Sequence, residues 1–277
     1  MEINRNKKTG DITIKQEQYI KRVLEKFRMT ESKAVTTPAV AKEYLENAQE
    51  EQFSEKSSTE FRSAVGSLMF TAVATRPDIM FAVSSVSRFM AKPTAGAWQQ
   101  IKRILRYLKG TTSMGITYRA NGNQELIAYS DADYANCVQT RKSTSGLVLI
   151  LANGPVVWTS QQQQIVARST TEAEYVAAAE ATKQVLWLRN LLKSIDIDQS
   201  TTTLYVDNQG ALKIVENQEH HRRTKHIDVR YHLIRDHTMK KDITVDYVPS
   251  EEQLADILTK RLPRDTFTRL RSQLGMT

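Results

Sequence analysis

Apolar residues follow two different spacings along this chain, and the spacing changes part-way along it. Residues 11–14 alternate like a strand after a polar turn, and apolar residues at helical spacing follow over residues 19–27. Residues 30–58 are rich in Glu and Ser and show little periodicity, whereas helical spacing returns over residues 59–118. We therefore expect four segments: a hairpin with a helix over 1–29, a linker over 30–58, a helical segment over 59–118 and a domain of strands and helices over 119–277.

The last of these segments alternates between strand and helix patterns. Its predicted elements are strands at 125–131, 145–151 and 154–159, a long helix at 171–195, a strand at 201–207 followed by a short helix, a helix near 226–239, a strand at 243–248 and a final helix from Glu251 onward. Three consecutive strands followed by two helical crossovers predict an α/β fold, with a five-stranded mixed sheet flanked by helices. A small, mostly helical domain is expected to precede it.

Composition limits the class of protein. The chain has 277 residues, 40% of them hydrophobic and 25% charged, which is ordinary for a soluble globular protein. Its longest clean apolar stretch, residues 147–152, is too short to span a bilayer, and the first residues lack the apolar core of a secretory signal. The single cysteine, Cys137, excludes an internal disulfide. We expect an intracellular protein, cytoplasmic or nuclear, that does not associate with membranes.

Four acidic residues stand where a predicted strand ends or a predicted helix begins: Asp131, Glu174, Asp207 and Asp256. Acids in such places can converge at one edge of a sheet, and convergent carboxylates commonly hold hard divalent cations. The chain as a whole is basic, with a formal charge of +8, which favours a polyanionic partner. The combination indicates metal-dependent chemistry on a polyanion.

Three of these acids also have purely structural interpretations. Asp131 suits a turn in which it bonds its own backbone, and Asp133 lies on the same side of the strand and is an equal candidate for a metal ligand. Asp207 suits the N-cap of the helix that follows it, and Asp256 suits the favourable dipole of an early helical turn.

The role of Glu174 depends on which of two overlapping capping boxes forms. If Thr171 is the N-cap, the Glu174 carboxylate closes the box at the helix start. If Ser169 is the N-cap, Glu172 closes the box and Glu174 faces the edge of the sheet. The sequence leaves both registers open.

Basic residues gather on two predicted helices. On the helix around residues 98–108, Lys102, Arg106 and Lys109 share one face, which suits either a solvated surface or phosphate contacts.

On the helix near residues 226–239, Arg223, His226 and Arg230 share an outer basic face suited to phosphate. All five histidines lie in or beside this helix at spacings that scatter them around it, so a zinc site is not expected.

Six motifs in the second part resemble the ribonuclease H region of copia-type retrotransposon polyproteins. They are Tyr129-Ser-Asp-Ala-Asp133, Arg141-Lys-Ser-Thr-Ser-Gly146, Ser169-Thr-Thr-Glu-Ala-Glu-Tyr175, Tyr205-Val-Asp-Asn-Gln209, Thr224-Lys-His-Ile-Asp-Val-Arg-Tyr-His232 and Leu254-Ala-Asp-Ile-Leu-Thr-Lys260. Upstream, Phe61-Arg-Ser-Ala-Val-Gly-Ser-Leu-Met69, Thr75-Arg-Pro-Asp-Ile79, Ser87-Arg-Phe-Met90 and Arg103-Ile-Leu-Arg-Tyr-Leu-Lys-Gly-Thr111 resemble the segment that follows the polymerase palm. The resemblance covers nearly the whole chain.

The resemblance implies a ribonuclease H-like fold and a substrate, the RNA strand of an RNA–DNA hybrid, cut hydrolytically with two Mg²⁺ ions or with Mn²⁺ as a substitute. By position, Asp131, Glu174, Asp207 and Asp256 match the four metal-binding acids of the family. Our hypothesis is that Asp131 bridges both ions, with Glu174 and Asp207 on one and Asp256 on the other.

The resemblance also implies contacts to nucleic acid. Gln209 matches a position that contacts the hybrid in the family. We expect further contacts from basic residues of the motifs and of the two helices described above: Arg141, Lys142, Arg223, Lys225, His226, Arg230, Lys102, Arg106 and Lys109.

The paired aspartates of a polymerase, in a Tyr-x-Asp-Asp hairpin, do not occur in this sequence. We therefore expect the chain to begin just after that motif and not to synthesise DNA. On this interpretation residues 1–29 match the palm edge, residues 59–118 match the thumb or connection, and the missing palm or other proteins of the element are expected partners. The alternatives are a nucleic-acid-binding remnant without turnover and a scaffold segment.

Overall fold

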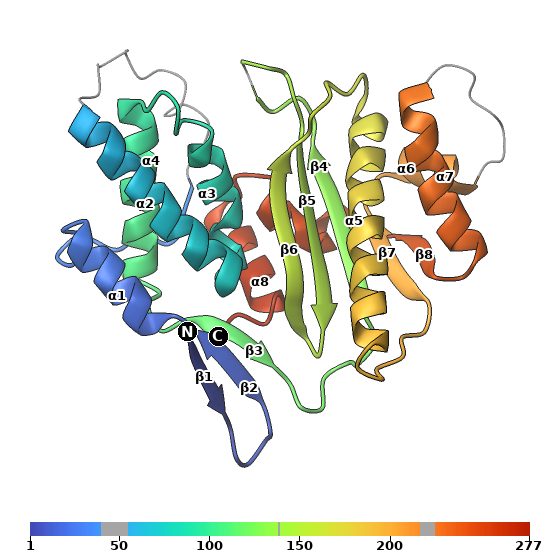
Figure 1. Cartoon of the computed structure of the whole chain (residues 1–277), viewed down its shortest axis with the longest axis horizontal. Coiled ribbons are helices and arrows are strands. Elements are labelled where there is room, and N and C mark those ends of the chain that lie inside the picture. The colour runs from blue at the N-terminus through green and yellow to red at the C-terminus, as the bar shows by residue number, and fades with distance from the viewer. Residues whose placement is uncertain (40–54, 138, 217–224) are drawn as a thin grey trace. The chain divides into compact units, whose positions relative to one another are not determined.

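The chain folds into two compact units in the computed structural model, which describes residues 1–39, 55–137, 139–216 and 225–277. The first unit contains Met1–Ala120 and Lys260–Thr277, and the second contains Asn121–Thr259 (Figure 1). The chain therefore leaves the first unit, builds the second, and returns. This division differs from the single C-terminal domain expected over residues 119–277, because the last 18 residues pack with the first unit.

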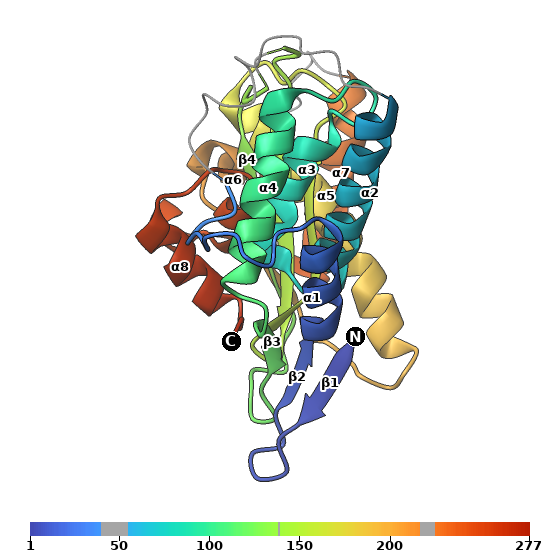
Figure 2. The ribbon, with the colours of Figure 1, turned by 90° about the vertical axis from the view of Figure 1, so that its left-hand side faces the viewer.

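The first unit combines a small sheet with helices, as Figure 2 shows from the side. Its strands β1 (Glu2–Arg5), β2 (Ile12–Lys15) and β3 (Gly115–Tyr118) form an antiparallel sheet in that order. Its helices are α1 (Glu17–Lys26), α2 (Glu55–Ala74), η2 (Pro77–Ile79, a 3₁₀ turn), α3 (Met80–Ser87), α4 (Ala95–Lys109) and α8 (Arg264–Gln273). The predicted hairpin and helix at the start of the chain are both present.

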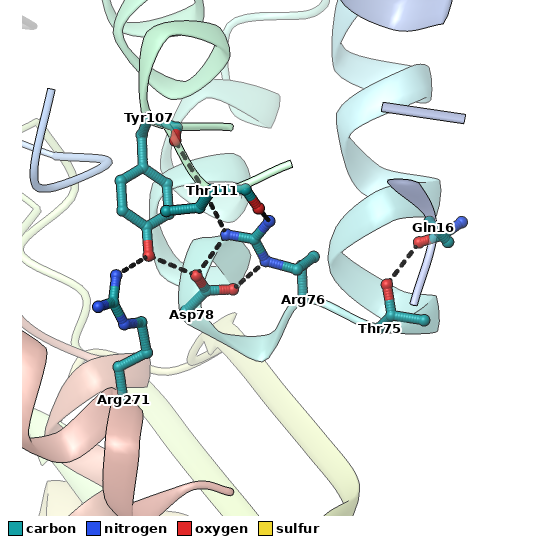
Figure 3. Close-up of polar contacts among 7 residues, drawn as sticks. All are labelled: Gln16, Thr75, Arg76, Asp78, Tyr107, Thr111 and Arg271. Carbon is teal, nitrogen blue, oxygen red and sulfur yellow. Dashed lines mark hydrogen bonds and ion pairs between the residues drawn. The ribbon is translucent and has the colours of Figure 1, made fainter. Parts of the chain in front are cut away.

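A buried polar cluster anchors α8 to this unit (Figure 3). The guanidinium of Arg76 donates from Nε and Nη2 to the Asp78 carboxylate at 2.9 and 2.8 Å. The Tyr107 hydroxyl donates to the same carboxylate at 2.6 Å and accepts from Arg271 of α8 at 2.9 Å. Burial, with Asp78 adding to it, raises the pKa of Tyr107 well above its ordinary value, so the hydroxyl remains a donor.

The last residues extend the small sheet. The N–H of Gly115 donates to the carbonyl of Thr277 at 2.9 Å, and the N–H of Thr277 donates back at 3.0 Å. The N–H of Thr117 donates to the carbonyl of Gly275 at 2.9 Å. Backbone pairing of this kind gives the end of the chain a fixed place in the first unit.

The second unit has the predicted five-stranded mixed sheet. Its strands are β4 (Ile127–Asp133), β5 (Thr144–Leu151), β6 (Gly154–Gln162), β7 (Thr202–Val206) and β8 (Ile243–Tyr247). They lie in the order β6-β5-β4-β7-β8. The pairs β4–β5 and β5–β6 are antiparallel, and the pairs β4–β7 and β7–β8 are parallel. An antiparallel meander followed by two parallel crossovers is the ribonuclease H-like topology, which confirms the expected fold class.

Helices cover the sheet of the second unit. α5 (Thr170–Lys193) runs across β4, β5 and β7, and α6 (Gln209–Glu216) and α7 (Lys225–Met239) lie farther toward β8 (Figure 1). The core lies between α5 and the sheet and contains Ala128, Leu149, Tyr175, Val185 and Leu204, each at most 1% exposed. Among the described residues, no helix is both long and apolar enough to cross a membrane.

The final predicted helix, from Glu251 onward, is wrong as a continuous element. The structure instead has two 3₁₀ turns, η3 (Ser250–Glu252) and η4 (Leu254–Leu258), and α8 begins only at Arg264. Pro263 explains the break, because a proline disfavours helical backbone in the residue before it. Asp256 therefore sits in a short 3₁₀ turn of the second unit rather than in an α-helix.

Candidate metal centre

Three of the four predicted acids converge at one edge of the mixed sheet. Asp131 lies near the end of β4, Asp207 directly follows β7, and Asp256 lies in η4. Because β4 and β7 are neighbouring parallel strands, their carboxyl ends meet at the same edge. One carboxylate oxygen from each aspartate lies within 4.8 Å of those of the other two.

The donor set fits a hard divalent cation. All three candidate ligands offer carboxylate oxygens, which Mg²⁺ and Mn²⁺ prefer to nitrogen or sulfur. Asp131 is fully buried and Asp256 is 9% exposed, while Asp207 is half-buried. Charge–charge interactions are stronger away from water, so this partly buried group of three negative charges favours a bound cation.

The structure decides between Asp131 and Asp133 for this group. Asp131 belongs to it, and the Thr259 hydroxyl donates a hydrogen bond to its Oδ2. Asp133, two residues on, accepts from Asn136 Nδ2 at 2.9 Å instead and is not one of the three. Its role is therefore in the loop after β4.

The N-cap role open to Asp207 is filled by its neighbour. Asn208 Oδ1 accepts from the N–H of Ala211 at 2.9 Å at the start of α6. Asp207 itself accepts from the Ser250 hydroxyl at 2.9 Å, a contact that joins the end of β7 to the loop after β8. The Asp207 carboxylate therefore does not cap α6 and instead lies beside those of Asp131 and Asp256.

Ser169 is the N-cap of α5, which settles the capping register. Its hydroxyl accepts from the N–H of Glu172 at 3.1 Å, and the Glu172 carboxylate accepts from the N–H of Arg168 at 2.7 Å. Glu172 thus closes the box, and Glu174 is 4% exposed on the inner side of the helix. Glu174 nevertheless does not join the three aspartates, and its assignment as the fourth metal ligand stays a prediction.

A glutamine that the sequence did not single out fixes the start of α5. Gln163 is 6% exposed, and its Nε2 donates to the Ser145 hydroxyl at 2.8 Å and to the carbonyl of Ala173 at 2.9 Å. It therefore links the start of β5 to the first turn of the helix, next to Glu174.

A stacked tyrosine pair lies on the same side of the sheet as two of the aspartates. The rings of Tyr129 and Tyr205 are 5.1 Å apart, and each tyrosine stands two residues before Asp131 or Asp207 on its strand. Burial raises the pKa of Tyr129, with Tyr205 and Glu252 adding to the shift. The pair keeps β4 and β7 in register just before they deliver their carboxylates.

The segment that carries Asp256, residues 253–259, packs tightly against the sheet. Gln253 and Thr259 at its two ends are both fully buried and hydrogen-bonded to β4. At its middle it lies so close to β5 that a Cβ on Gly146 would come within 3.0 Å of the Ala255 carbonyl. The sequence predicted a helix over these residues and gave Gln253 and Thr259 no part in the site, because their contacts with β4 join positions far apart in the chain.

Some of the predicted nucleic-acid contacts can be placed. Arg141 is exposed and Lys142 is half-buried in the loop from β4 to β5, at the end of the sheet that bears Asp131. Gln209 is exposed at the start of α6, two residues after Asp207.

The basic face of α4 belongs to the first unit. There Lys102, Arg106 and Lys109 are half-buried, and Arg106 Nε donates to the carbonyl of Lys33 at 2.6 Å. That bond ties the segment after α1 to α4, so Arg106 has a structural role in addition to the predicted one.

The remaining predicted contacts cannot be placed in the same way. Arg223 lies outside the described residues, and the side chains of Lys225, His226 and Arg230 do as well. The assignment of all these residues to nucleic-acid binding stays a prediction.

Comparison with known proteins decides the family. The chain is 40% identical to the retrovirus-related Pol polyprotein from transposon TNT 1-94 of Nicotiana tabacum, over 100% of this chain and 21% of that protein. It is 38% identical to the corresponding polyprotein from transposon RE1 of Arabidopsis thaliana, over 95% of this chain and 18% of that protein. The chain belongs to the copia-type retrotransposon Pol polyproteins. It spans about a fifth of the length of these Pol relatives.

The Pol family chain is less similar to solved structures than to these polyprotein sequences. No family model matches the sequence. Among solved structures, LC11-RNase H1 from compost matches at a TM-score of 0.38 and 15% identity, over 53% of this chain and 97% of that one. The foamy viral protease-reverse transcriptase in complex with double-stranded DNA matches at 0.41 and 14% identity, over 74% of this chain and 32% of that one.

Proposed function

We propose that this chain hydrolyses the RNA strand of RNA–DNA hybrids with the help of divalent cations, as a ribonuclease H. The observation that carries the proposal is the convergence of Asp131, Asp207 and Asp256 within 4.8 Å at one edge of a ribonuclease H-like sheet. Membership of the Pol polyproteins of retrotransposons supports a nucleic acid as substrate.

Asp131, Asp207 and Asp256 would hold the cation, with Glu174 proposed as an additional ligand for a second ion. When bound, Mg²⁺ ions supply an activated water and stabilise the leaving oxygen of a phosphodiester. The chain positions its ligands by separate elements, β4, β7 and η4, so each carboxylate is fixed by the sheet or by a turn packed on it. Such preorganisation is what a precise metal site requires.

Substrate binding falls to the residues around this edge. Arg141 and Lys142 lie in the loop between β4 and β5, and a phosphate backbone is attracted to such positive charges. Gln209 is proposed to contact the hybrid from the start of α6. Preference for RNA would come from contacts to 2′-hydroxyl groups in the minor groove.

The experiment is incubation of the full chain with a hybrid labelled on the RNA or on the DNA strand, with Mg²⁺ or with a chelator. We expect Mg²⁺-dependent cutting of the RNA strand only. Asp131→Asn should reduce the rate by at least about 100-fold, since it removes one charge of the metal site. Asp198→Asn serves as the matched control, because Asp198 is an exposed acid of the same unit.

Two other outcomes would replace the proposal. Salt-sensitive binding of the hybrid without cleavage would indicate a nucleic-acid-binding remnant. Neither cleavage nor binding would indicate a scaffold segment.

A further inference from the structure

The structure assigns a positioning role to Gln253 and Thr259: together they hold Asp256 against Asp131 before any cation binds. This inference rests on the proposed function, because it concerns the metal site of that function. It goes beyond that function in naming two residues outside the set of proposed metal ligands.

Gln253 anchors the start of the Asp256 segment to the central strand. Its Nε2 donates to the carbonyl of Ser130 at 3.0 Å, and its Oε1 accepts from the N–H of Ala255 at 3.2 Å. One amide therefore caps η4 and joins it to the residue directly before Asp131. Gln253 is fully buried, so water does not compete for either bond.

Thr259 anchors the end of the same segment. Its hydroxyl donates to Asp131 Oδ2 and also lies 3.3 Å from the carbonyl of Asp256. Its N–H donates to that carbonyl at 3.2 Å. Thr259 is fully buried and contacts two of the three aspartates, Asp131 and Asp256.

Apolar packing fills the space between the two anchors. Ala255, Ile257 and Leu258 are each at most 2% exposed, and a Cβ on Gly146 of β5 would lie 2.8 Å from the Leu258 Cβ. The segment therefore has no room to slide along the sheet. Packing sets how close it lies, whereas the two polar anchors set its register on β4.

The register matters because Asp256 comes from a different element than Asp131. A 3₁₀ turn of five residues has few hydrogen bonds of its own and does not hold one conformation unaided. Without the anchors, Asp256 would reach the group of three only part of the time. Metal affinity falls by the fraction of molecules in the competent conformation.

Two measurements on the full chain test this role. The first is hydrogen exchange of the amides of residues 254–259 in metal-free protein, and the second is Mn²⁺ binding followed by electron paramagnetic resonance. Gln253→Leu and Thr259→Val remove the two anchors at nearly constant volume. We expect faster exchange in this segment and about 10- to 100-fold weaker Mn²⁺ binding, the usual effect of losing a partner of a metal ligand.

Matched controls separate this role from a general loss of stability. Gln199→Leu removes an amide that makes similar bonds to Leu126 and Gln124 at the opposite end of β4. Thr182→Val removes a fully buried hydroxyl that bonds only within α5. Both controls should leave Mn²⁺ affinity unchanged, and Thr259→Ser should restore it because it keeps the hydroxyl.

The outcomes distinguish this inference from the proposed function. Unchanged exchange in residues 254–259 would overturn the anchoring, whatever the metal does. Faster exchange with wild-type Mn²⁺ affinity would overturn the positioning role and leave the proposed function intact. Absence of Mn²⁺ binding by the wild-type chain would overturn both.

Discussion

Replacing Gly146 by alanine should damage the metal site more than the fold. Gly146 pairs with Asp131 across β4 and β5, and the Asp256 segment lies directly over it. A Cβ at this position would lie 2.6 Å from Thr259 Cγ2, 2.8 Å from Leu258 Cβ and 3.0 Å from the Ala255 carbonyl oxygen. Ordinary contacts between carbon atoms are about 3.5–4.0 Å, so the two surfaces must separate by roughly 1 Å.

The size of the effect follows from that separation. Overpacking of a core typically costs about 1–3 kcal/mol, and the backbone preference of alanine over glycine in a strand offsets about 0.5–1 kcal/mol of it. We therefore expect Gly146→Ala to lower the free energy of unfolding by about 1–2 kcal/mol. Mg²⁺ requires ligand distances near 2.0–2.1 Å, so moving Asp256 by a substantial part of 1 Å should weaken metal binding by about 10- to 100-fold.

The assay is a Mg²⁺ titration by calorimetry, together with urea denaturation of the same samples. Gly115→Ala in the first unit is the matched overpacking control. A Cβ on Gly115 would lie 2.7 Å from Lys15 Cβ and closer than a normal contact to the Ile14 carbonyl oxygen. This substitution should cost stability without changing Mg²⁺ affinity. Gly66→Ala, with nothing within 4 Å, should stabilise α2 by about 0.5–1 kcal/mol. Wild-type Mg²⁺ affinity in Gly146→Ala would refute the reasoning.

Three further predictions concern the first unit. Asp78→Asn should lower its free energy of unfolding in urea by about 3–5 kcal/mol, because Arg76 is fully buried beside it; a loss below about 1 kcal/mol would contradict this. Burial raises the pKa of Tyr118 to about 12, so stability present below pH 10 should decline as the pH rises toward 12. Tyr118→Phe should make that decline in urea midpoints smaller, while the buried Tyr107 and Tyr129 keep part of it; an unchanged decline would contradict this. Lys15 and Lys21 lower the pKa of Glu17 to about 2. The wild type should therefore be more stable than Glu17→Gln at pH 7, and this difference in the free energy of unfolding should disappear as the pH falls from 4.5 through 2. A stability difference that stays constant with pH would count against the ion pairs.

Much of the sheet could be predicted because its strands carry strong local signals. The alternating and apolar runs before Asp131 and Asp207 gave the strands that end at the site, and the order of elements gave the topology. The N-cap of α5 is different. Ser169 and Thr171 offer equal capping chemistry, and tertiary packing of the helix on the sheet decides between them.

The region after β8 was the least predictable part. Its residues read as a helix because acids and apolar residues alternate there at near-helical spacing, yet contacts of Gln253 and Thr259 with β4 hold a 3₁₀ turn instead. The place of α8 depends on Arg271 meeting Tyr107, a contact across 164 positions of sequence. Long-range contacts of this kind leave no mark on local periodicity.

The account depends most on Asp131, Asp207 and Asp256 holding a cation together. Anomalous diffraction from crystals of the full chain soaked in Mn²⁺ tests this directly. We predict an anomalous peak within ligand distance of all three carboxylates, and its loss in Asp207→Asn crystals. A soaked crystal with no peak among these aspartates, or with its peak elsewhere, would contradict the account.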